Sequence, residues 1–117
     1  MTKDELVERL GDPALTLLDV RSPEEYSGET GYACDARQGH IPRARNVDVR
    51  ELFGLTPEEV RERVGAAEGA EVVAYCHSGQ RSAMAAAALR AAGYDARNYV
   101  GSWHEWSADE SLPSETP

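Results

Sequence analysis

The 117-residue sequence predicts an α/β domain with a central, mainly parallel sheet flanked by helices. Two compact apolar segments of strand length, at residues 15–20 and 71–75, are each followed by a segment that favours helix. Such alternation is typical of a parallel sheet, because parallel strands need a crossover connection between them. A chain of this length fits one domain and can bury one core without disulfides or metal ions.

The first third of the chain predicts two helices around one strand. Residues 2–10 have the pattern of a short amphipathic helix that begins with a capping box. The apolar segment 15–20 is expected to be a strand buried on both faces. Ser22 and Pro23 then have the residue types of an N-cap and a first helical position. Residues 27–45 are irregular and long for a connection, and such loops are often functional.

The rest of the chain predicts five elements before its last helix or turn. These are a short strand at 47–49, a helix at 56–64, a strand at 71–75, an Ala-rich helix at 82–92 and a buried strand at 96–100. Trp103 and Trp106 follow at helical spacing, which is more typical of core closure than of a substrate wall. We expect residues 1–108 to form the domain and the acidic residues 109–117 to be a flexible tail.

The charge of the chain limits its partners. Its net charge is −9, from 12 Lys and Arg against 21 Asp and Glu. This balance argues against nucleic acid and anionic membranes as partners, since both require a basic face. A site for a small anion must therefore depend on local hydrogen-bond donors and local cations.

The two cysteines, Cys34 and Cys76, are far apart in the sequence. The polar N-terminus and the lack of a long apolar segment predict a cytoplasmic protein with reduced thiols. Cys34 is either a resolving thiol for Cys76 or an incidental loop thiol. The His, Cys and carboxylate residues do not follow a metal-ligand spacing, so the sequence predicts no metal.

The stretch from Cys76 to Ser82 is the strongest candidate for chemistry, because it joins a predicted buried strand to a predicted helix. Ligands of open α/β sheets bind at this edge, where helix N-termini and curled loops present N–H groups. Gly79 permits the tight curvature that such a loop needs. The N–H donors and the helix dipole would favour a Cys76 thiolate, and Arg81 would bind an oxyanion. The alternative is that Cys76 is a small buried hydrophobic residue.

The sequence resembles the rhodanese family, in which a cysteine opens a six-residue active-site loop. Besides the loop from Cys76 to Arg81, three segments resemble family signatures in the right order, namely Leu18–Tyr26, Gly39–Asn46 and Gly101–Trp106. The long segment 27–45 and the ending Gly-Ser-Trp-His-Glu-Trp are similar to the catalytic second half of tandem rhodaneses. The resemblance implies a three-layer fold with a central sheet and a sulfurtransferase activity that needs no cofactor.

The length of the loop separates possible activities within this resemblance. Related phosphatases and arsenate reductases have a longer loop with Arg six positions after the cysteine, where Ser82 stands here. Mercaptopyruvate sulfurtransferases resemble Cys-Gly-Ser/Thr-Gly-Val-Thr, whereas this loop contains the basic Arg81. The resemblance therefore implies a thiosulfate-type enzyme.

Several residues near the loop are candidates for supporting roles. The resemblance places Arg21 near the pocket, where it either binds substrate or pairs with Asp19, which we expect to support the loop. His77 is expected at the rim, facing incoming substrate. His40 is expected to have a structural role and His104 to lie on the surface.

The resulting hypothesis is a double displacement on Cys76. Thiosulfate donates sulfane sulfur to Cys76, and a cyanide ion or a thiol, including a protein acceptor, then takes it. The expected substrate-binding residues are Arg81, His77, Ser78, Gly79, Gln80, Ser82 and Arg21. A persulfide carrier for a partner protein and a non-catalytic interaction module stay as alternatives.

Overall fold

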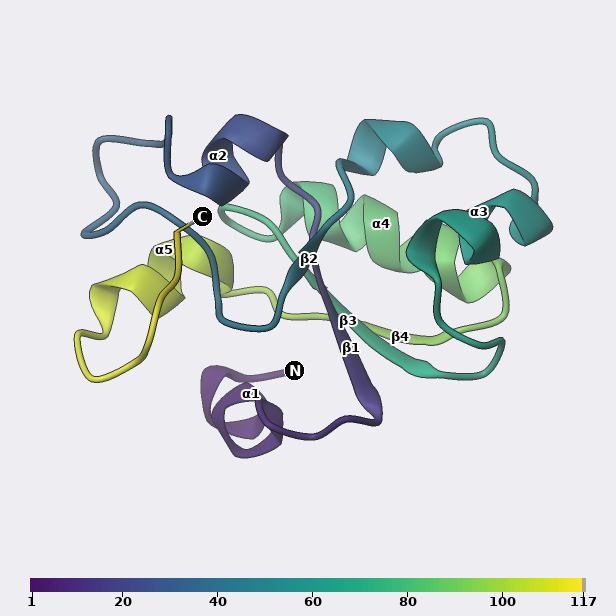
Figure 1. The fold of residues 1–117 in the computed structure, drawn as a ribbon, viewed down its shortest axis with the longest axis horizontal. Coiled ribbons are helices and arrows are strands. Elements are labelled where there is room, and N and C mark those ends of the chain that lie inside the picture. Colours follow the sequence, from purple (N-terminus) through teal and green to yellow (C-terminus); the bar gives the residue numbers. More distant parts are fainter. Residues whose placement is uncertain (117) are drawn as a thin grey trace.

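The computed structural model describes residues 1–116 and contains one four-stranded sheet in the order β2-β1-β3-β4 (Figure 1). Its strands are β1 (Leu15–Asp19), β2 (Arg45–Asn46), β3 (Glu71–Tyr75) and β4 (Asp95–Asn98). All three pairings between them are parallel. The predicted α/β fold with a parallel sheet is thus confirmed.

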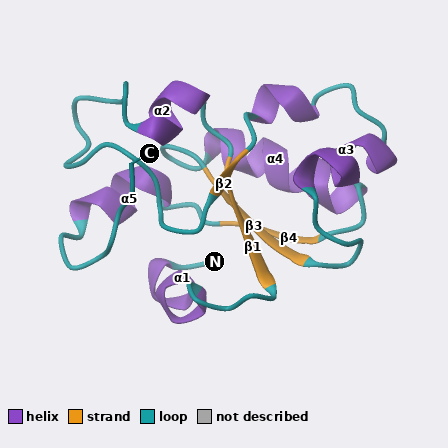
Figure 2. Cartoon of the chain, viewed as in Figure 1, coloured by secondary structure: helices purple, strands orange, loops and turns teal. Residues whose placement is uncertain are grey.

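Helices cover both sides of the sheet (Figure 2). They are α1 (Lys3–Arg9), α2 (Pro23–Ser27), the 3₁₀ helix η1 (Val49–Leu52), α3 (Pro57–Val64), α4 (Gln80–Ala91) and α5 (Ser102–Ala108). Across residues 1–116, none of the helices has the length and apolar character needed to cross a membrane.

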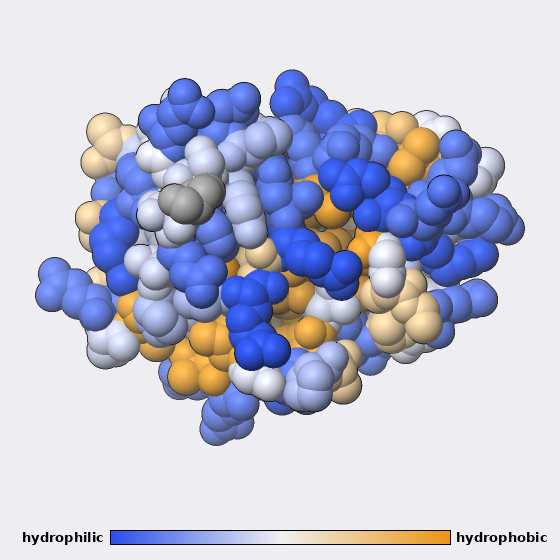
Figure 3. All heavy atoms as spheres, viewed as in Figure 1, coloured by the Kyte–Doolittle hydropathy of each residue, from blue (hydrophilic) through white to orange (hydrophobic). Residues whose placement is uncertain are grey.

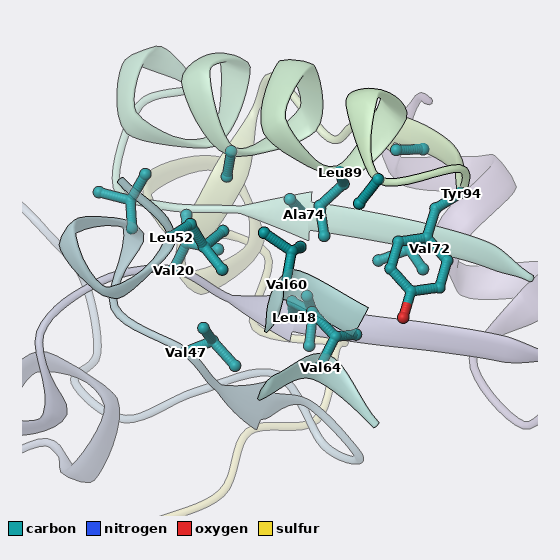
Figure 4. Packing of buried hydrophobic residues seen from close by; sticks show 14 of the residues in the cluster. Leu18, Val20, Val47, Leu52, Val60, Val64, Val72, Ala74, Leu89 and Tyr94 are labelled. Atoms are coloured by element: carbon teal, nitrogen blue, oxygen red, sulfur yellow. The ribbon is translucent and has the colours of Figure 1, made fainter. Parts of the chain in front are cut away.

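The alternation of side chains along β1 and β3 creates two separate cores. Leu18 and Val72 point into a cluster with residues of η1, α3 and α4 (Figure 4). Leu17 and Val73 point to the opposite face, where they join residues of α1 and α5. Because both faces of the sheet are covered, the central strands β1 and β3 are mostly apolar and buried, and the fold has three layers.

The prediction of a strand at residues 47–49 is wrong. Strand β2 lies at Arg45–Asn46 instead, and Val49 begins the 3₁₀ helix η1. Asp48 accounts for this change, because its carboxylate accepts a hydrogen bond from the Arg50 N–H at 3.0 Å and caps the helix. The local capping geometry therefore overrides the β-branched residues that suggested a strand.

The segment after α5 packs against the domain. His40 and Glu115 exchange two backbone hydrogen bonds of 2.9 Å, and the Trp106 indole N–H donates to the Pro113 carbonyl at 2.7 Å. Composition alone predicted a flexible tail at 109–117, whereas these contacts hold residues 109–116 against the loop that precedes β2. Residue 117 lies outside the described residues.

The surface agrees with the acidic composition. On the face shown in Figure 3, hydrophilic residues dominate, and hydrophobic residues are visible in smaller groups between them. A surface of this kind, on a chain of net charge −9, repels anionic polymers.

Candidate active site at the carboxyl end of β3

The loop between β3 and α4 surrounds the sulfur atom of Cys76 with donors. Cys76 directly follows β3, and its side chain is buried. The Gly79 N–H donates to Cys76 Sγ at 3.1 Å, and the Ser82 hydroxyl donates to the same atom at 3.3 Å. The thiol sulfur therefore accepts from one backbone donor of the loop and from one hydroxyl donor in the first turn of α4.

Gly79 is required by the shape of this loop. Its φ angle is +96°, in the left-handed region that side chains disfavour. A Cβ atom at this position would also lie 2.8 Å from the Val100 carbonyl oxygen. The close approach of the loop to the chain after β4 thus depends on glycine.

The surroundings of Cys76 favour its thiolate form. Burial raises the pKa of the thiol. Hydrogen bonds from the Ser82 hydroxyl and from the backbone amides of Ser82, Gly79 and Ser78 lower this pKa by more, so the net shift is downward. The sulfur also lies at the N-terminal end of α4, where the helix dipole stabilises negative charge. A thiolate is the nucleophilic form of cysteine.

Ser102 also contacts Cys76, and the sequence alone did not single it out. Its hydroxyl accepts a hydrogen bond from the Cys76 N–H at 3.1 Å and donates to the Tyr99 carbonyl at 2.9 Å. It lies 3.9 Å from Cys76 Sγ. Its φ angle is +56°, a strained value of the kind that clusters at functional sites. Its place in the Gly101-Ser102-Trp103 ending was the available signal.

Arg81 is held by an acidic residue of α2. Its guanidinium donates to both carboxylate oxygens of Glu25, at 2.8 and 3.1 Å. Burial raises the pKa of Glu25, but Arg81 outweighs this and lowers it to about 2. The two side chains line a pocket together with Ser22, Asp48, Val49 and Arg50. Arg81, the residue expected to bind an oxyanion, therefore lines this pocket with its positive charge paired to the Glu25 carboxylate.

Asp19 and Arg21 form a buried ion pair at the end of β1. Arg21 Nε donates to Asp19 Oδ1 at 2.9 Å, and Arg21 Nη2 donates to Asp19 Oδ2 at 2.6 Å. Nη2 also donates to the Gly39 carbonyl at 2.6 Å, and the guanidinium lies over the Trp103 ring at 5.2 Å. Arg21 thus braces β1 against the 28–44 loop and α5. Its binding of substrate stays a prediction.

The other residues that the sequence predicted near the site differ in how far they are exposed to solvent. Ser78 is exposed on the loop, and Gln80 is exposed at the first position of α4. His77 is mostly buried, and its Nε2 lies 2.9 Å from Asp35 Oδ1, beneath the stacked ring of Tyr32. His40 is buried and stacked on Tyr26, as expected of a structural residue.

Comparison with known protein families agrees with a cysteine-centred site at the carboxyl end of β3. Residues 2–109 match the family model of the rhodanese-like domain. The chain belongs to the rhodanese-like domain family. The resemblance drawn from the four sequence motifs is therefore confirmed.

Individual rhodanese relatives are sulfurtransferases. The chain is 36% identical over 123 residues to a thiosulfate sulfurtransferase of Azotobacter vinelandii, covering 97% of this chain and 45% of that protein. It is 36% identical over 121 residues to a probable 3-mercaptopyruvate sulfurtransferase of Pseudomonas aeruginosa, covering 95% and 42%. A crystal structure described as a probable thiosulfate sulfurtransferase has a TM-score of 0.85 and 47% identity, covering 98% and 46%. The chain thus spans less than half the length of these relatives.

Proposed function

We propose that this rhodanese-like domain is a thiosulfate-type sulfurtransferase that carries sulfane sulfur as a persulfide on Cys76. The observation that carries this proposal is the set of donors around Cys76 Sγ, above all the Gly79 N–H at 3.1 Å and the Ser82 hydroxyl at 3.3 Å. Donors arranged in this way stabilise an anionic sulfur, which is needed both before and after sulfur transfer.

The proposed reaction has two displacements. The Cys76 thiolate attacks the outer sulfur of thiosulfate, a new S–S bond forms, and the old S–S bond breaks with its electron pair leaving on sulfite. Cyanide or a thiolate then attacks the outer sulfur of the persulfide, and Cys76 leaves as a thiolate. Each step moves one sulfur atom between nucleophiles, so no external oxidant or reductant is consumed.

Arg81 is proposed to bind the sulfonate end of the donor. A guanidinium matches a planar face of oxyanion oxygens, and the positive charge offsets the repulsion expected from a chain of net charge −9. Because Glu25 binds both terminal nitrogens of the guanidinium in this structure, the donor must displace the carboxylate or share the guanidinium with it. The loop residues from His77 to Ser82 would complete the site.

Persulfide delivery to a partner protein is the second candidate function. The Arg81–Glu25 pair favours it, because a neutralised arginine binds thiosulfate weakly while the donors around Cys76 still stabilise a persulfide. A mercaptopyruvate donor is also compatible with the family, and the basic loop residue Arg81 favours thiosulfate over it. The donor therefore has to be identified by experiment.

Intact mass measurement tests the proposal. The reduced protein is incubated with thiosulfate, freed of excess donor and weighed, with Cys76→Ser as the control. We expect a gain of one sulfur atom that disappears on adding cyanide and is absent from Cys76→Ser. Rapid thiocyanate turnover in the same sample would favour the enzyme over the carrier. No gain of sulfur from thiosulfate would overturn the thiosulfate assignment, and mercaptopyruvate would be the next donor to test.

A further inference from the structure

Four potential metal ligands from three separate segments meet beside the active-site loop. Cys34 and Asp35 come from the loop before β2, His77 from the loop after Cys76, and His104 from α5. One ligand atom from each residue lies within 4.8 Å of the others. Because 42 residues separate Asp35 from His77, sequence spacing gave no sign of this cluster.

The carboxylate of Asp35 is the centre of the cluster and lacks a full set of partners. Asp35 Oδ1 lies 2.9 Å from His77 Nε2 and 2.8 Å from His104 Nδ1. The side chain is only 1% exposed, and Oδ2 has no hydrogen-bond partner within the described residues. A buried carboxylate oxygen without a partner is costly, so it points to a missing positive ligand.

The spacing of the four residues is close to what a tetrahedral ion requires. Metal–ligand bonds of 2.0–2.3 Å place the donor atoms of a tetrahedral zinc site roughly 3.3–3.6 Å apart. The His–Asp distances of 2.8 and 2.9 Å are shorter than this, and the distance of 4.0 Å between Cys34 Sγ and His104 Nδ1 is longer. With all four ligand atoms within 4.8 Å of one another, shifts of about an ångström or less would bring them to tetrahedral spacing.

The donor set selects the class of metal. Thiolate and imidazole ligands favour zinc and similar transition ions, whereas calcium and magnesium take oxygen ligands. A Cys34 thiolate and an Asp35 carboxylate would together neutralise a divalent ion. We propose that Cys34, Asp35, His77 and His104 form a tetrahedral binding site for a divalent transition metal of the zinc class.

This site would connect the loop before β2 and α5 to the catalytic loop. His77 directly follows Cys76, and its carbonyl accepts a hydrogen bond from the His104 N–H at 3.1 Å. The exposed side chains of Cys34 and His104 give an ion access from solvent. The ion would replace the protons between Asp35 and the two imidazoles and fix the position of His77 beside the nucleophile.

Cobalt substitution tests the site directly. The untagged protein carrying Cys76→Ser, which removes the catalytic thiol as a competing ligand, is titrated with Co²⁺. We expect one equivalent to produce the intense visible bands of tetrahedral cobalt together with a thiolate-to-cobalt charge-transfer band, and Zn²⁺ to abolish both. Octahedral spectra, or the absence of cobalt binding at micromolar protein, would overturn the proposal.

Variants of the two exposed ligands show whether these residues hold the ion. In the same background, Cys34→Ala should abolish the charge-transfer band, and His104→Ala should weaken Zn²⁺ binding at least tenfold in competition with a chromogenic chelator. Glu110→Gln, an exposed acid that follows α5, is the matched control and should leave binding unchanged. A charge-transfer band that survives Cys34→Ala, with circular dichroism unchanged, would also overturn the proposal. The test is independent of sulfur transfer, because Cys76 is absent.

Discussion

The guanidinium of Arg81 and the carboxylate of Glu25 form a two-point ion pair, at 2.8 and 3.1 Å, in the pocket beside the loop that follows Cys76. Both groups are partly shielded from solvent, with side-chain exposures of 30% and 13%. An anionic donor that binds Arg81 has to displace this carboxylate or share the guanidinium with it. Glu25 is therefore expected to weaken the binding of small anions.

Replacing Glu25 with glutamine should improve the use of thiosulfate. Glu25→Gln keeps an oxygen that can accept the hydrogen bond from the Ser22 N–H, so the start of α2 is preserved. It removes the charge that competes for Arg81, and we expect kcat/KM for thiosulfate to rise about three- to tenfold, as for the loss of a partly exposed ion pair. Thiocyanate formation at varied thiosulfate concentration measures this change.

The neighbouring Glu24 provides the control for this variant. It is exposed on the same helix, and Glu24→Gln removes the same charge without contacting Arg81. If Glu24→Gln and Glu25→Gln increase kcat/KM equally, net charge explains the effect and the ion pair does not.

The same pair should contribute to the acid stability of the domain. The Arg81 guanidinium lowers the pKa of Glu25 from its ordinary value of 4.5 to about 2 in the folded protein, so the stabilisation from this pair is fully present above pH 4.5. It is lost as the pH falls from about 4.5 to about 2. Urea midpoints measured across this range should fall less steeply for Glu25→Gln than for the wild type. Equal slopes would contradict the pairing.

Removal of the Ser82 hydroxyl should reduce the reactivity of Cys76. This hydroxyl donates to the sulfur at 3.3 Å, and it contributes to the lowered pKa of the thiol. In Ser82→Ala the pKa should rise, and alkylation by iodoacetamide near neutral pH should slow roughly tenfold, as expected for one hydrogen bond to an anion. The rate of alkylation as a function of pH gives the thiol pKa directly.

Ser78→Ala is the matched control for this experiment. Ser78 lies on the same loop with an exposed side chain, and the substitution keeps its backbone N–H. Its alkylation profile should match that of the wild type. A shift as large as that of Ser82→Ala would show that loop flexibility, and not the hydroxyl, controls the thiol.

Local patterns were enough to predict the candidate active-site loop but not the residues that surround it in the fold. Cys76, Gly79 and Arg81 are close in sequence, so strand, turn and helix signals placed them together. Glu25 lies 56 residues from Arg81, and its capping-box role gives no indication of a second contact. Ser102 lies 26 residues from Cys76 and depends on a positive φ angle. Such contacts follow from the tertiary fold.

The strands also differ in whether the local sequence or the tertiary fold determines them. The strands β1 and β3 have continuous apolar segments, and they were predicted within one residue of their observed ends. The two-residue strand β2 has an exposed and a half-buried residue, so it has no hydrophobic pattern. Strand β2 lies beside β1 because the residue that follows it, Val47, is bound to β1. The Val47 N–H donates to the Asp19 carbonyl at 3.0 Å.

The buried Asp19–Arg21 pair should stabilise the fold, and the effects of replacing its two residues on the free energy of unfolding should not be additive. Arg21→Met leaves the Asp19 carboxylate buried without its partner, which we expect to lower the free energy of unfolding by about 3–5 kcal/mol, and Asp19→Leu should have a similar effect. The double variant removes both charges and should be more stable than either single variant, although the Gly39 carbonyl still loses its donor. Urea denaturation of the four proteins measures this coupling.

Thiosulfate kinetics of the double variant then separate the two roles of Arg21. Unchanged KM would leave it a structural residue, whereas a large rise in KM in a stably folded double variant would assign it to substrate binding.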